Sequence, residues 1–587
     1  MLCGLFAQVL GLDQVGAEDG FFDLGGDSIM SMQLVARARA AGLVFSPRDV
    51  FTARTPAGLA AIAETAGVVR EVPADVGTGE VMLTPVMRWV LDRGGPVSRF
   101  SQSMVVTVPA GAGLGDLTGA VQVIVDHHDM LRARLEAVSP GPGQVPGASG
   151  WRLVAGAPGS VDAATLVRRV DAAGTARDGL AAVVAAERET AVAGLDPAAG
   201  VMLRAVWVDT GPGRAGLLVV VVHHLVVDGV SWRVLLPDLA AAWQAVTTGR
   251  PVALDPVGTS FRRWSQLLAA RARDEQVTAE LDWWQGVLDG GDQQLGSRPL
   301  GTGDTVARMR QILAAVPSQQ VRPLVERVPA VFRCGMHEVL LAGLAAAVAR
   351  WRPGRGGLLV EVEGHGREPE GLAQPVDVSR TVGWFTSIYP LRLDPGPVSF
   401  SEIAAGGPAA GRLLKRVKEQ VRAVPGNGLS FGLLRYLNPQ AAAVLAGYPA
   451  PQIGFNYLGR FTATAPGADD RDEIAAWRPA GSRVLGGGAD ADQLAAHVLE
   501  VSALVRDLPG GPELRLTMGW AGDVLDEASV RELAGLWAEA LGGLAAHATQ
   551  SDAGGLTPSD LPLVQLDQDE VEGLEEIARE IEEGTAT

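Results

Sequence analysis

The feature that most restricts the fold of this chain is a break in its apolar periodicity just after residue 67. Up to about residue 68, apolar side chains recur at helical spacing, whereas residues 69–79 are rich in Val, Pro, Gly and acidic side chains and show no period. A new helical pattern opens at Leu83. Such a stretch is typical of a linker. We therefore expect a small domain over residues 1–68, a linker over 69–79 and a much larger part after it.

The first 68 residues predict a small all-α bundle of four short helices. Leu2, Phe6 and Val9 fall on one helical face, and a second helix follows Ser28. Two further helix starts are marked by Ser-Pro at 46–47 and Thr-Pro at 55–56. In each, a capping residue precedes a proline, which suits the first helical turn.

The large part alternates apolar strands with Ala-rich helices. Residues 217–222 and 357–362 read as strands, and residues 339–350 read as a helix. This alternation predicts an α/β fold. A Pro-containing crossing at 251–256 divides it into two lobes, 80–250 and 251–550, and leaves 551–587 as a C-terminal linker or docking helix.

Length and charge narrow the class of protein. A chain of 587 residues exceeds what one hydrophobic core usually serves. Its 49 basic and 67 acidic side chains give a net charge of −18, and no basic cluster could follow a phosphate backbone, so we expect no nucleic acid partner. No apolar stretch approaches the roughly 20 residues of a membrane span, and no secretory leader is recognisable. Two cysteines, Cys3 and Cys334, are too few for a disulfide framework. Together these features lead us to expect a cytoplasmic protein with no membrane partner.

A candidate attachment serine ends the run Phe-Phe-Asp-Leu-Gly-Gly-Asp-Ser at residues 21–28, just before the second predicted helix. Read alone, Ser28 or Asp27 is only a helix cap. The whole run resembles the phosphopantetheine attachment site of a peptidyl carrier protein, and its Gly-Gly-Asp-Ser form resembles carriers that precede epimerization domains. The resemblance implies that Ser28 carries 4'-phosphopantetheine, whose phosphate a helix N-terminus favours.

A second motif, His-His-Leu-Val-Val-Asp-Gly at residues 223–229, follows the predicted strand 217–222. Adjacent side chains at a strand end point to opposite faces, so at most one of the two histidines faces a shared cavity. The run resembles the HHxxxDG motif of the condensation-domain superfamily, which has a two-lobed, chloramphenicol-acetyltransferase-like fold. By that resemblance His224 is the catalytic histidine, His223 supports it, and Asp228 holds the loop.

An earlier histidine pair, His127 and His128, precedes Asp129 but lacks a following glycine. It also follows a predicted helix, 117–125, rather than a strand. The pair resembles a structural motif of the same family, so we expect no catalytic role for it.

The run Glu-Gly-His-Gly-Arg-Glu at residues 363–368 distinguishes two activities within this superfamily. A carboxylate in such a place is commonly a solvated loop residue, but the run resembles the signature of epimerization domains. The resemblance implies that Glu363 faces His224 across the lobe interface. Three further runs match epimerization motifs in the same order, at residues 380–386, 429–437 and 455–459. The last contains Tyr457, which the resemblance places in the lining of the site.

The chemistry that these residues suit is inversion of an α-carbon. An α-proton beside a thioester is weakly acidic, so its removal needs a positioned base and stabilisation of the developing charge. A carboxylate with raised proton affinity and a neutral histidine opposite could remove and return the proton. We predict a nonribosomal peptide synthetase epimerase that converts a carrier-bound aminoacyl or peptidyl thioester from L to D and needs no metal and no cofactor beyond the arm.

The resemblance also implies partners: an upstream adenylation domain, a downstream condensation domain and a phosphopantetheinyl transferase. Two alternatives stay open. The same histidine motif serves condensation domains, which join two carrier-bound substrates, although Glu363 and the Asn456-Tyr457 motif argue against that activity. The other alternative is a non-catalytic carrier and docking module.

The end of the sequence predicts an acidic helix with a short apolar stripe. Val571, Leu574 and Ile577 recur at helical spacing after Asp567. Two interpretations are open: a linker that packs on the large domain, or a docking helix that recruits the next enzyme through a basic groove.

Overall fold

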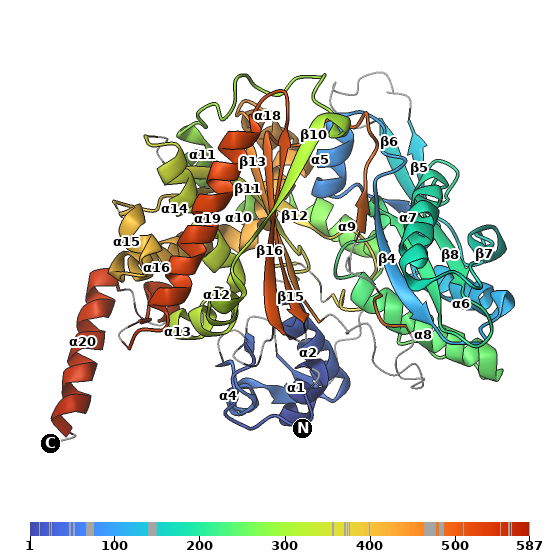
Figure 1. Ribbon diagram of the computed structural model, residues 1–587, viewed down its shortest axis with the longest axis horizontal. Helices are drawn as coiled ribbons and strands as arrows, with labels where there is room; N and C mark the ends of the chain where they lie inside the picture. The colour runs from blue at the N-terminus through green and yellow to red at the C-terminus, as the bar shows by residue number, and fades with distance from the viewer. Residues whose placement is uncertain are drawn as a thin grey trace.

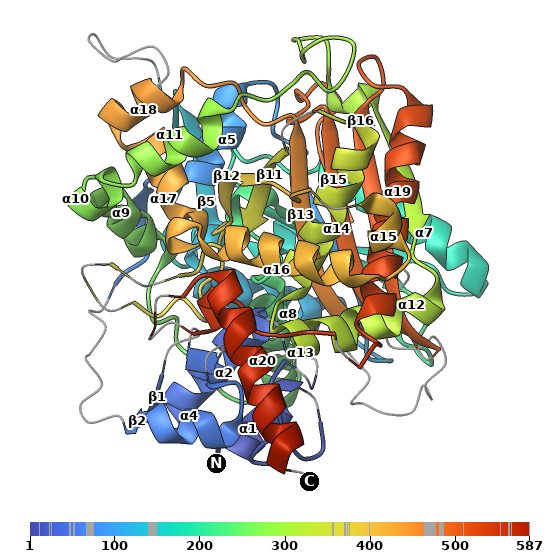
Figure 2. The same ribbon diagram turned by 90° about the vertical axis from the view of Figure 1, so that its left-hand side faces the viewer.

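The computed structural model describes residues 1–585, except for residues 11, 23, 25, 27, 46–48, 51–52, 66–74, 139–149, 355–356, 369–370, 373, 375, 398, 463–476, 481–485, 509, 552, 562–563 and 565. It contains a small helical domain and a large body in which two sheets stand side by side, each with helices packed on it (Figure 1). The small domain lies at one end of the large body in both views (Figures 1 and 2).

The small domain consists of helices α1 (Leu2–Leu10), α2 (Ser28–Ala40) and α4 (Pro56–Ile62) and a two-stranded sheet of β1 (Leu43–Val44) and β2 (Glu64–Thr65). The rings of Phe6 and Phe21 meet edge to face, 5.1 Å apart, in its core. Helix α4 begins as predicted, because the side chain of Thr55 accepts a hydrogen bond from the Gly58 amide at 3.0 Å. Three of the four predicted helices are thus described, and the start predicted at 46–47 lies outside the described residues.

The first lobe is organised around a five-stranded sheet in the order β14-β4-β9-β8-β7. Strand β9 is almost wholly apolar because both of its faces are buried: Val219 and Val221 meet helix α7, while Val220 and Val222 meet the main core. The predicted strand 217–222 is therefore confirmed. The elements of this half are β3 (Gly79–Val81), α5 (Pro85–Arg93), β4 (Ser101–Val108), α6 (Leu114–His127), β5 (Ala133–Ala137), β6 (Trp151–Ala155), β7 (Val167–Asp171), α7 (Arg177–Ala193), β8 (Leu203–Asp209), β9 (Gly216–His223) and α8 (Trp232–Thr248).

The second lobe contains a six-stranded sheet in the order β10-β16-β15-β13-β11-β12. Strand β11 runs parallel to β13 and antiparallel to β12. Glu361 lies opposite Gly454 and Val362 opposite Phe455, so the end of β11 lies beside the first half of β13. The strands are β10 (Met309–Ala315), β11 (Leu358–Gly364), β12 (Ser387–Leu393), β13 (Ile453–Thr462), β15 (Leu499–Leu508) and β16 (Gly511–Ala521). The helices are α9 (Phe261–Arg271), α10 (Glu275–Thr278), α11 (Leu281–Asp289), α12 (Ser318–Arg322), α13 (Val328–Phe332), α14 (Met336–Trp351), α15 (Phe400–Ala404), α16 (Pro408–Arg422), α17 (Leu429–Gly432), α18 (Pro439–Leu445) and α19 (Glu527–His547).

Helix α14 is apolar on all sides because it is buried against the sheet and against α16 and α19, with every residue from Val339 to Val348 buried. Among the described residues, no single helix combines the length and apolar composition of a membrane span. One pair, 318–332 with 336–351, meets both criteria only when joined, across a bend of 104°.

Residues 477–480 and 486–488, which follow β13 in the chain, lie against the sheet of the first lobe. The amides of Trp477 and Ala480 each donate to a β4 carbonyl at 2.8 Å, and strand β14 (Gly486–Gly488) pairs with β4, placing Gly487 opposite Gln102. The division predicted at residue 250 assigns these residues to the second lobe, while their backbone pairs with β4 of the first. The physical reason is that an edge strand leaves unpaired backbone groups, which these residues satisfy.

The C-terminal helix α20 (Gln568–Thr585) extends away from the large body (Figure 1). Val571 is fully buried, and the Nζ atom of Lys415 lies 3.4 Å from a Glu572 carboxylate oxygen. Leu574 and Ile577 are 51% and 54% exposed. The first turn is therefore anchored on α16, and the apolar stripe beyond it is open.

Candidate active site

The two adjacent histidines point into different surroundings. Strand β9 ends at His223, and a single 3-10 turn (His224–Val226) redirects the chain. The Nε2 atom of buried His223 donates to the carbonyl oxygen of Val97 at 2.7 Å, and its Nδ1 atom accepts from the Leu225 amide at 3.3 Å. Burial lowers the pKa of His223 to about 4. This ring is neutral at pH 7, and both of its nitrogens hold the loop.

The His224 ring packs against two aromatic side chains that also contact each other, with 5.3 Å between the ring centres of Phe100 and Trp384. It stacks on Phe100 with 4.7 Å between ring centres and 8° between planes, and it contacts Trp384 at 4.5 Å. Its Nε2 atom is 3.0 Å from the Nε2 atom of Gln102. Burial lowers the pKa of His224 to about 4, with the charge of Asp228 opposing the shift. His224 is therefore neutral near pH 7 and able to accept a proton.

A buried ion pair joins the histidine loop to the other lobe. The Nη2 atom of Arg367 donates to both carboxylate oxygens of Asp228, at 3.1 and 3.2 Å, and the Ser231 amide donates to Asp228 at 2.7 Å. Asp228 follows His224 by four residues, and Arg367 follows Glu363 by four. The pair thus brings the two predicted catalytic loops together. Removing one partner of such a buried pair typically costs about 3–5 kcal/mol of folding stability, because the other charge is left uncompensated.

Glu363 occupies the end of β11. Its Oε2 atom accepts a hydrogen bond from the Nδ2 atom of Asn456 on β13 at 2.8 Å. Part of the Glu363 side chain is exposed at the surface. The protein packed around its carboxylate removes much of the surrounding water, and this desolvation raises the pKa of Glu363 to about 7. The charge of His497 opposes this rise, while Glu500 and Glu361 add to it. Glu363 can therefore hold or release a proton near neutral pH.

His497 and Glu361 form a second buried pair close to Glu363. The Nε2 atom of His497 lies 2.8 Å from the Oε2 atom of Glu361. Burial alone would lower the pKa of His497, but the hydrogen bond and charge of Glu361 raise it. Gly454 faces Glu361 in the sheet, and a Cβ atom there would come within 2.5 Å of the His497 ring. Glycine therefore makes room for a cationic histidine beside the catalytic candidate.

Tyr457 follows Asn456 on β13, where successive side chains alternate between the two faces. It is half-buried and packs against the main core. A role for Tyr457 in lining the site stays a prediction.

The earlier histidine pair is engaged in packing. The Nε2 atom of buried His128 lies 3.0 Å from an Asp238 carboxylate oxygen, and His127 contacts the carbonyl oxygen of Asp255 at 3.0 Å. His127, His128 and Asp238 offer three possible metal-ligand atoms within 4.8 Å of one another. Arg380 already pairs with the Asp238 carboxylate, so a cation there would meet a like charge.

Ser28 is the first residue of helix α2. A Cβ atom on Gly26, just before it, would come within 2.5 Å of the Phe21 ring, so the approach to the helix is compact. The start of a 13-residue helix favours an anion, and the position fits a phosphate-linked arm. One contact between this domain and the large body is the ion pair of Arg39 with Asp377 at 3.7 Å.

Three residues around the pair have roles that the sequence alone did not indicate. Arg367 lies inside the run 363–368, and its position in that motif is the one sequence feature that could have indicated its role. Gln102 and His497 reach the site through strand pairing between distant parts of the chain. Their own neighbours in the sequence give no signal for that contact.

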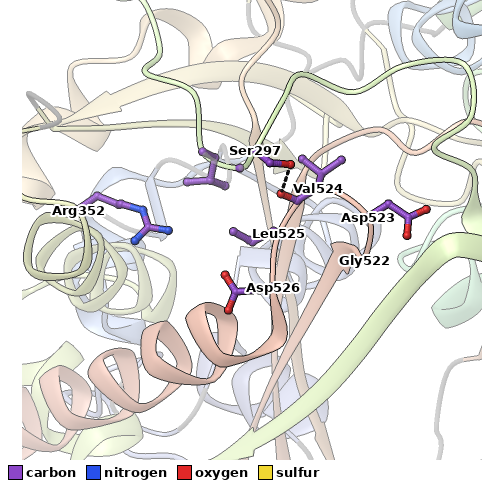
Figure 3. Close-up of a pocket in the computed structure, with 9 residues that line it drawn as sticks. Ser297, Arg352, Gly522, Asp523, Val524, Leu525 and Asp526 are labelled. Atoms are coloured by element: carbon purple, nitrogen blue, oxygen red, sulfur yellow. Dashed lines mark hydrogen bonds between the residues drawn. The ribbon is translucent and has the colours of Figure 1, made fainter.

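A cavity of about 420 Å³ lies at the turn between β16 and α19 (Figure 3). Figure 3 shows Arg352 and Asp526 on its walls, and a hydrogen bond of 3.2 Å from the Ser297 hydroxyl to the Val524 carbonyl oxygen closes one side. None of the predicted catalytic residues lines it. The cavity is separate from the candidate site.

Comparison with known protein families divides the chain in two. Residues 2–63 match the family described as a phosphopantetheine attachment site, and residues 79–555 match the condensation domain family. The first match confirms the predicted carrier, which bears its arm on a serine, and the second confirms the large α/β fold.

Individual relatives agree with these matches. The chain is 34% identical over 587 residues to a linear gramicidin synthase of Brevibacillus parabrevis, covering 97% of this chain and 10% of that protein. It is 32% identical to chondramide synthase of Chondromyces crocatus, covering 97% of this chain and 14% of that protein. The chain thus spans about a tenth of the length of these relatives.

Among solved structures, the chain resembles the epimerization domain from the third module of tyrocidine synthetase B. The TM-score is 0.66 at 26% identity, covering 82% of this chain and 99% of that one. The first condensation domain of the CDA synthetase shares the fold, with a TM-score of 0.55 at 17% identity over 80% of this chain and 97% of that one. This chain therefore belongs to the condensation domain family of nonribosomal peptide synthetases, with a phosphopantetheine attachment domain at its N-terminal end.

Proposed function

We propose that this chain epimerizes an aminoacyl or peptidyl group carried as a thioester on Ser28, converting its α-carbon from L to D. The observation that carries the proposal is geometric: the Asp228–Arg367 ion pair joins the loop of His224 to the strand end of Glu363, whose carboxylate accepts from Asn456. The pKa of His224 is lowered to about 4 and that of Glu363 is raised to about 7. Near neutral pH, a proton shared by the pair rests on Glu363 and leaves His224 free to accept another. Groups whose environments push their pKa values apart are suited to act as base and acid.

The residues of this chain would divide the work as follows. When bound, the phosphopantetheine arm supplies a thioester beside the α-carbon, which makes the α-proton more acidic. His224 takes the α-proton, and the carboxylic acid of Glu363 delivers a proton from the opposite side. The Asn456 amide steadies the Glu363 carboxyl group, and the Asp228–Arg367 pair keeps the two loops in place.

Condensation is the competing activity, because the same histidine motif serves both kinds of domain. The raised pKa of Glu363 and its hydrogen bond to Asn456 favour epimerization. The structural likeness to the tyrocidine synthetase epimerization domain supports the same choice.

A loading assay separates the two activities. The full chain is charged at Ser28 with an L-aminoacyl-phosphopantetheine, quenched at intervals and hydrolysed, and the acid is resolved on a chiral column. We expect the D form to appear on the chain alone. If the acid stays L, but a peptide bond forms when a donor thioester on a second carrier is added, condensation is the activity.

The pH dependence follows from the two shifted groups. Since the pKa of Glu363 is raised to about 7, its acid form is present below that pH and lost above it. His224 is neutral above about pH 4. The pair therefore holds one proton between these values, and epimerization per loaded carrier should decline as the pH rises through about 7.

The charge of His497 provides a test of whether Glu363 is the group that titrates near pH 7. A neutral side chain in H497Q no longer lowers the pKa of Glu363, so the alkaline decline should move to higher pH. The matched control H127Q, in the first lobe, should leave the profile unchanged. An alkaline decline that stays in place in H497Q would mean that Glu363 is not the titrating group.

The C-terminal helix should affect transfer to the next enzyme and not epimerization. Truncation after residue 566 should leave the D:L ratio unchanged, while transfer to a separate downstream condensation partner falls. Attraction between charges weakens as salt shortens the Debye length from about 10 Å at 0.1 M to about 3 Å at 1 M. Transfer by the intact chain should therefore decrease with salt.

Two point variants distinguish docking from packing. L574D changes an exposed residue and should reduce transfer only, whereas V571D changes the buried anchor and should detach the helix from the large domain. Equal transfer with and without the helix would exclude docking. Loss of epimerization on truncation would favour the packed linker.

A further inference from the structure

The hydrogen bonds around Gln102 determine where the His224 ring carries its proton. The indole nitrogen of Trp232 can only donate, and it lies 2.8 Å from the Oε1 atom of Gln102. The atom of Gln102 that faces Trp232 is therefore its carbonyl oxygen, and its amide nitrogen faces the Nε2 atom of His224 at 3.0 Å. Because an amide nitrogen donates, Nε2 accepts, and the neutral ring carries its hydrogen on Nδ1.

Gln102 has little freedom to turn round. It is 9% exposed and Trp232, at the start of α8, is 2% exposed. The backbone of Gln102 lies between two strands, opposite Val222 of β9 on one side and Gly487 of β14 on the other. Rotation of the amide would place two donors against each other at the indole and leave a buried N–H without a partner, which is unfavourable.

We propose that Gln102 and Trp232 are positioning residues that hold His224 as the neutral, Nδ1-protonated tautomer and thereby make it the base of the pair. The assignment of a base rests on the proposed function, whereas the tautomer does not. Because Nε2 has a single in-plane lone pair, Gln102 withdraws its amide before Nε2 takes the proton. The Cα–H bond then breaks, an Nε2–H bond forms and the electron pair stays on the substrate. The amide of Gln102 cannot donate to a protonated Nε2, and this favours return of the proton.

The other groups around the His224 ring do not decide which of its two nitrogens carries the hydrogen. Phe100 and Trp384 both pack against the ring and are uncharged. Asp228, on the same loop, favours a protonated ring, but its carboxylate is bound by Arg367. Adjacent His223 is neutral. Within the described ranges, the Nδ1 atom of the ring is buried and meets no hydrogen-bond partner of good geometry, so the amide of β4 is the partner that distinguishes the two nitrogens.

Nitrogen NMR on the full-length chain with ¹⁵N-labelled histidine tests the inference without any turnover. The His224 signals are identified as those missing from H224Q. In the wild-type chain at pH 7 we expect Nδ1 to resonate as a protonated nitrogen and Nε2 as an unprotonated one. A spectrum with the proton on Nε2 would overturn the proposal, and the deciding spectrum is that of the wild-type chain.

The variant Q102E supplies the positive test. A carboxylate accepts from both the Trp232 indole and a protonated Nε2, so the pKa of His224 should rise by at least about one unit, a tenfold change in proton affinity. W232F frees the Gln102 amide to turn and should raise the same pKa by a smaller amount. The exposed control Q440E should leave it unchanged.

The outcomes separate this inference from the proposed function. An unchanged His224 pKa in folded Q102E would contradict the positioning role. The expected tautomer and shift in a chain that never produces the D form would leave the inference standing and overturn epimerization instead.

Discussion

Replacing His224 by alanine, or Glu363 by glutamine, lowers the rate of L-to-D conversion on the loaded chain by about 10²–10⁴-fold, the range over which general acid–base groups contribute. The reason is that each change removes one of the two groups able to exchange a proton near neutral pH. Loading at Ser28 is unaffected, because that chemistry takes place in the small domain. Rates are measured by rapid quenching and chiral analysis after stoichiometric loading.

Controls for this prediction come from the other histidines. H223A and H128A remove buried side chains that hold loops, so both should act through stability, seen as a lower thermal midpoint. The folded fraction of H128A should epimerize at the wild-type rate. Wild-type conversion by either H224A or E363Q would refute the catalytic pair.

Replacing Ser28 by alanine abolishes attachment of phosphopantetheine. The hydroxyl group is the acceptor, and alanine has none, while alanine is a favourable residue within a helix. Intact-protein mass spectrometry after treatment with a phosphopantetheinyl transferase should show no added mass. S31A, three residues further along the same helix, is the matched control and should load normally. Added mass on S28A would show that another residue carries the arm.

Mixing two inactive chains extends this test. S28A retains both His224 and Glu363, and loaded H224A presents a substrate that it cannot invert itself. Together they should form the D product slowly, because a tethered carrier reaches an effective concentration of about millimolar, well above that of micromolar partners in solution. Absence of any D product from the mixture, with both chains folded, would contradict the division of roles between the two domains.

The fold was predictable where an element is buried on all sides. Strand 217–222 and residues 339–348 of helix α14 appear in the sequence as apolar runs, and residues 218–222 and 339–348 are buried in the structure. The ends were less predictable. Strand β11 continues to Gly364, so Glu363 lies within the strand and not in a loop beyond it. Its pairing with β12 and the polar contact to Asn456 extend the strand past the last apolar side chain.

The roles of the predicted catalytic residues stay a prediction, and the groups that tune them were not predictable from the sequence. Gln102 is opposite Gly487, and Glu361 is opposite Gly454 beneath His497. Each of these contacts joins parts of the chain that are far apart in sequence. They depend on which strands pair and in which register, and neither can be found from local periodicity.

The most direct test of the central claim is the exchange of the α-proton with solvent. The full-length chain, loaded at Ser28 with an L-aminoacyl group, is incubated in D₂O at pH 7, and the released acid is analysed by chiral chromatography coupled to mass spectrometry. The proposed function predicts that the D product carries a single deuterium at its α-carbon and that E363Q and H224A yield neither the D form nor deuterium. An acid that remains wholly L and free of deuterium, released from a folded and fully loaded wild-type chain, would contradict it.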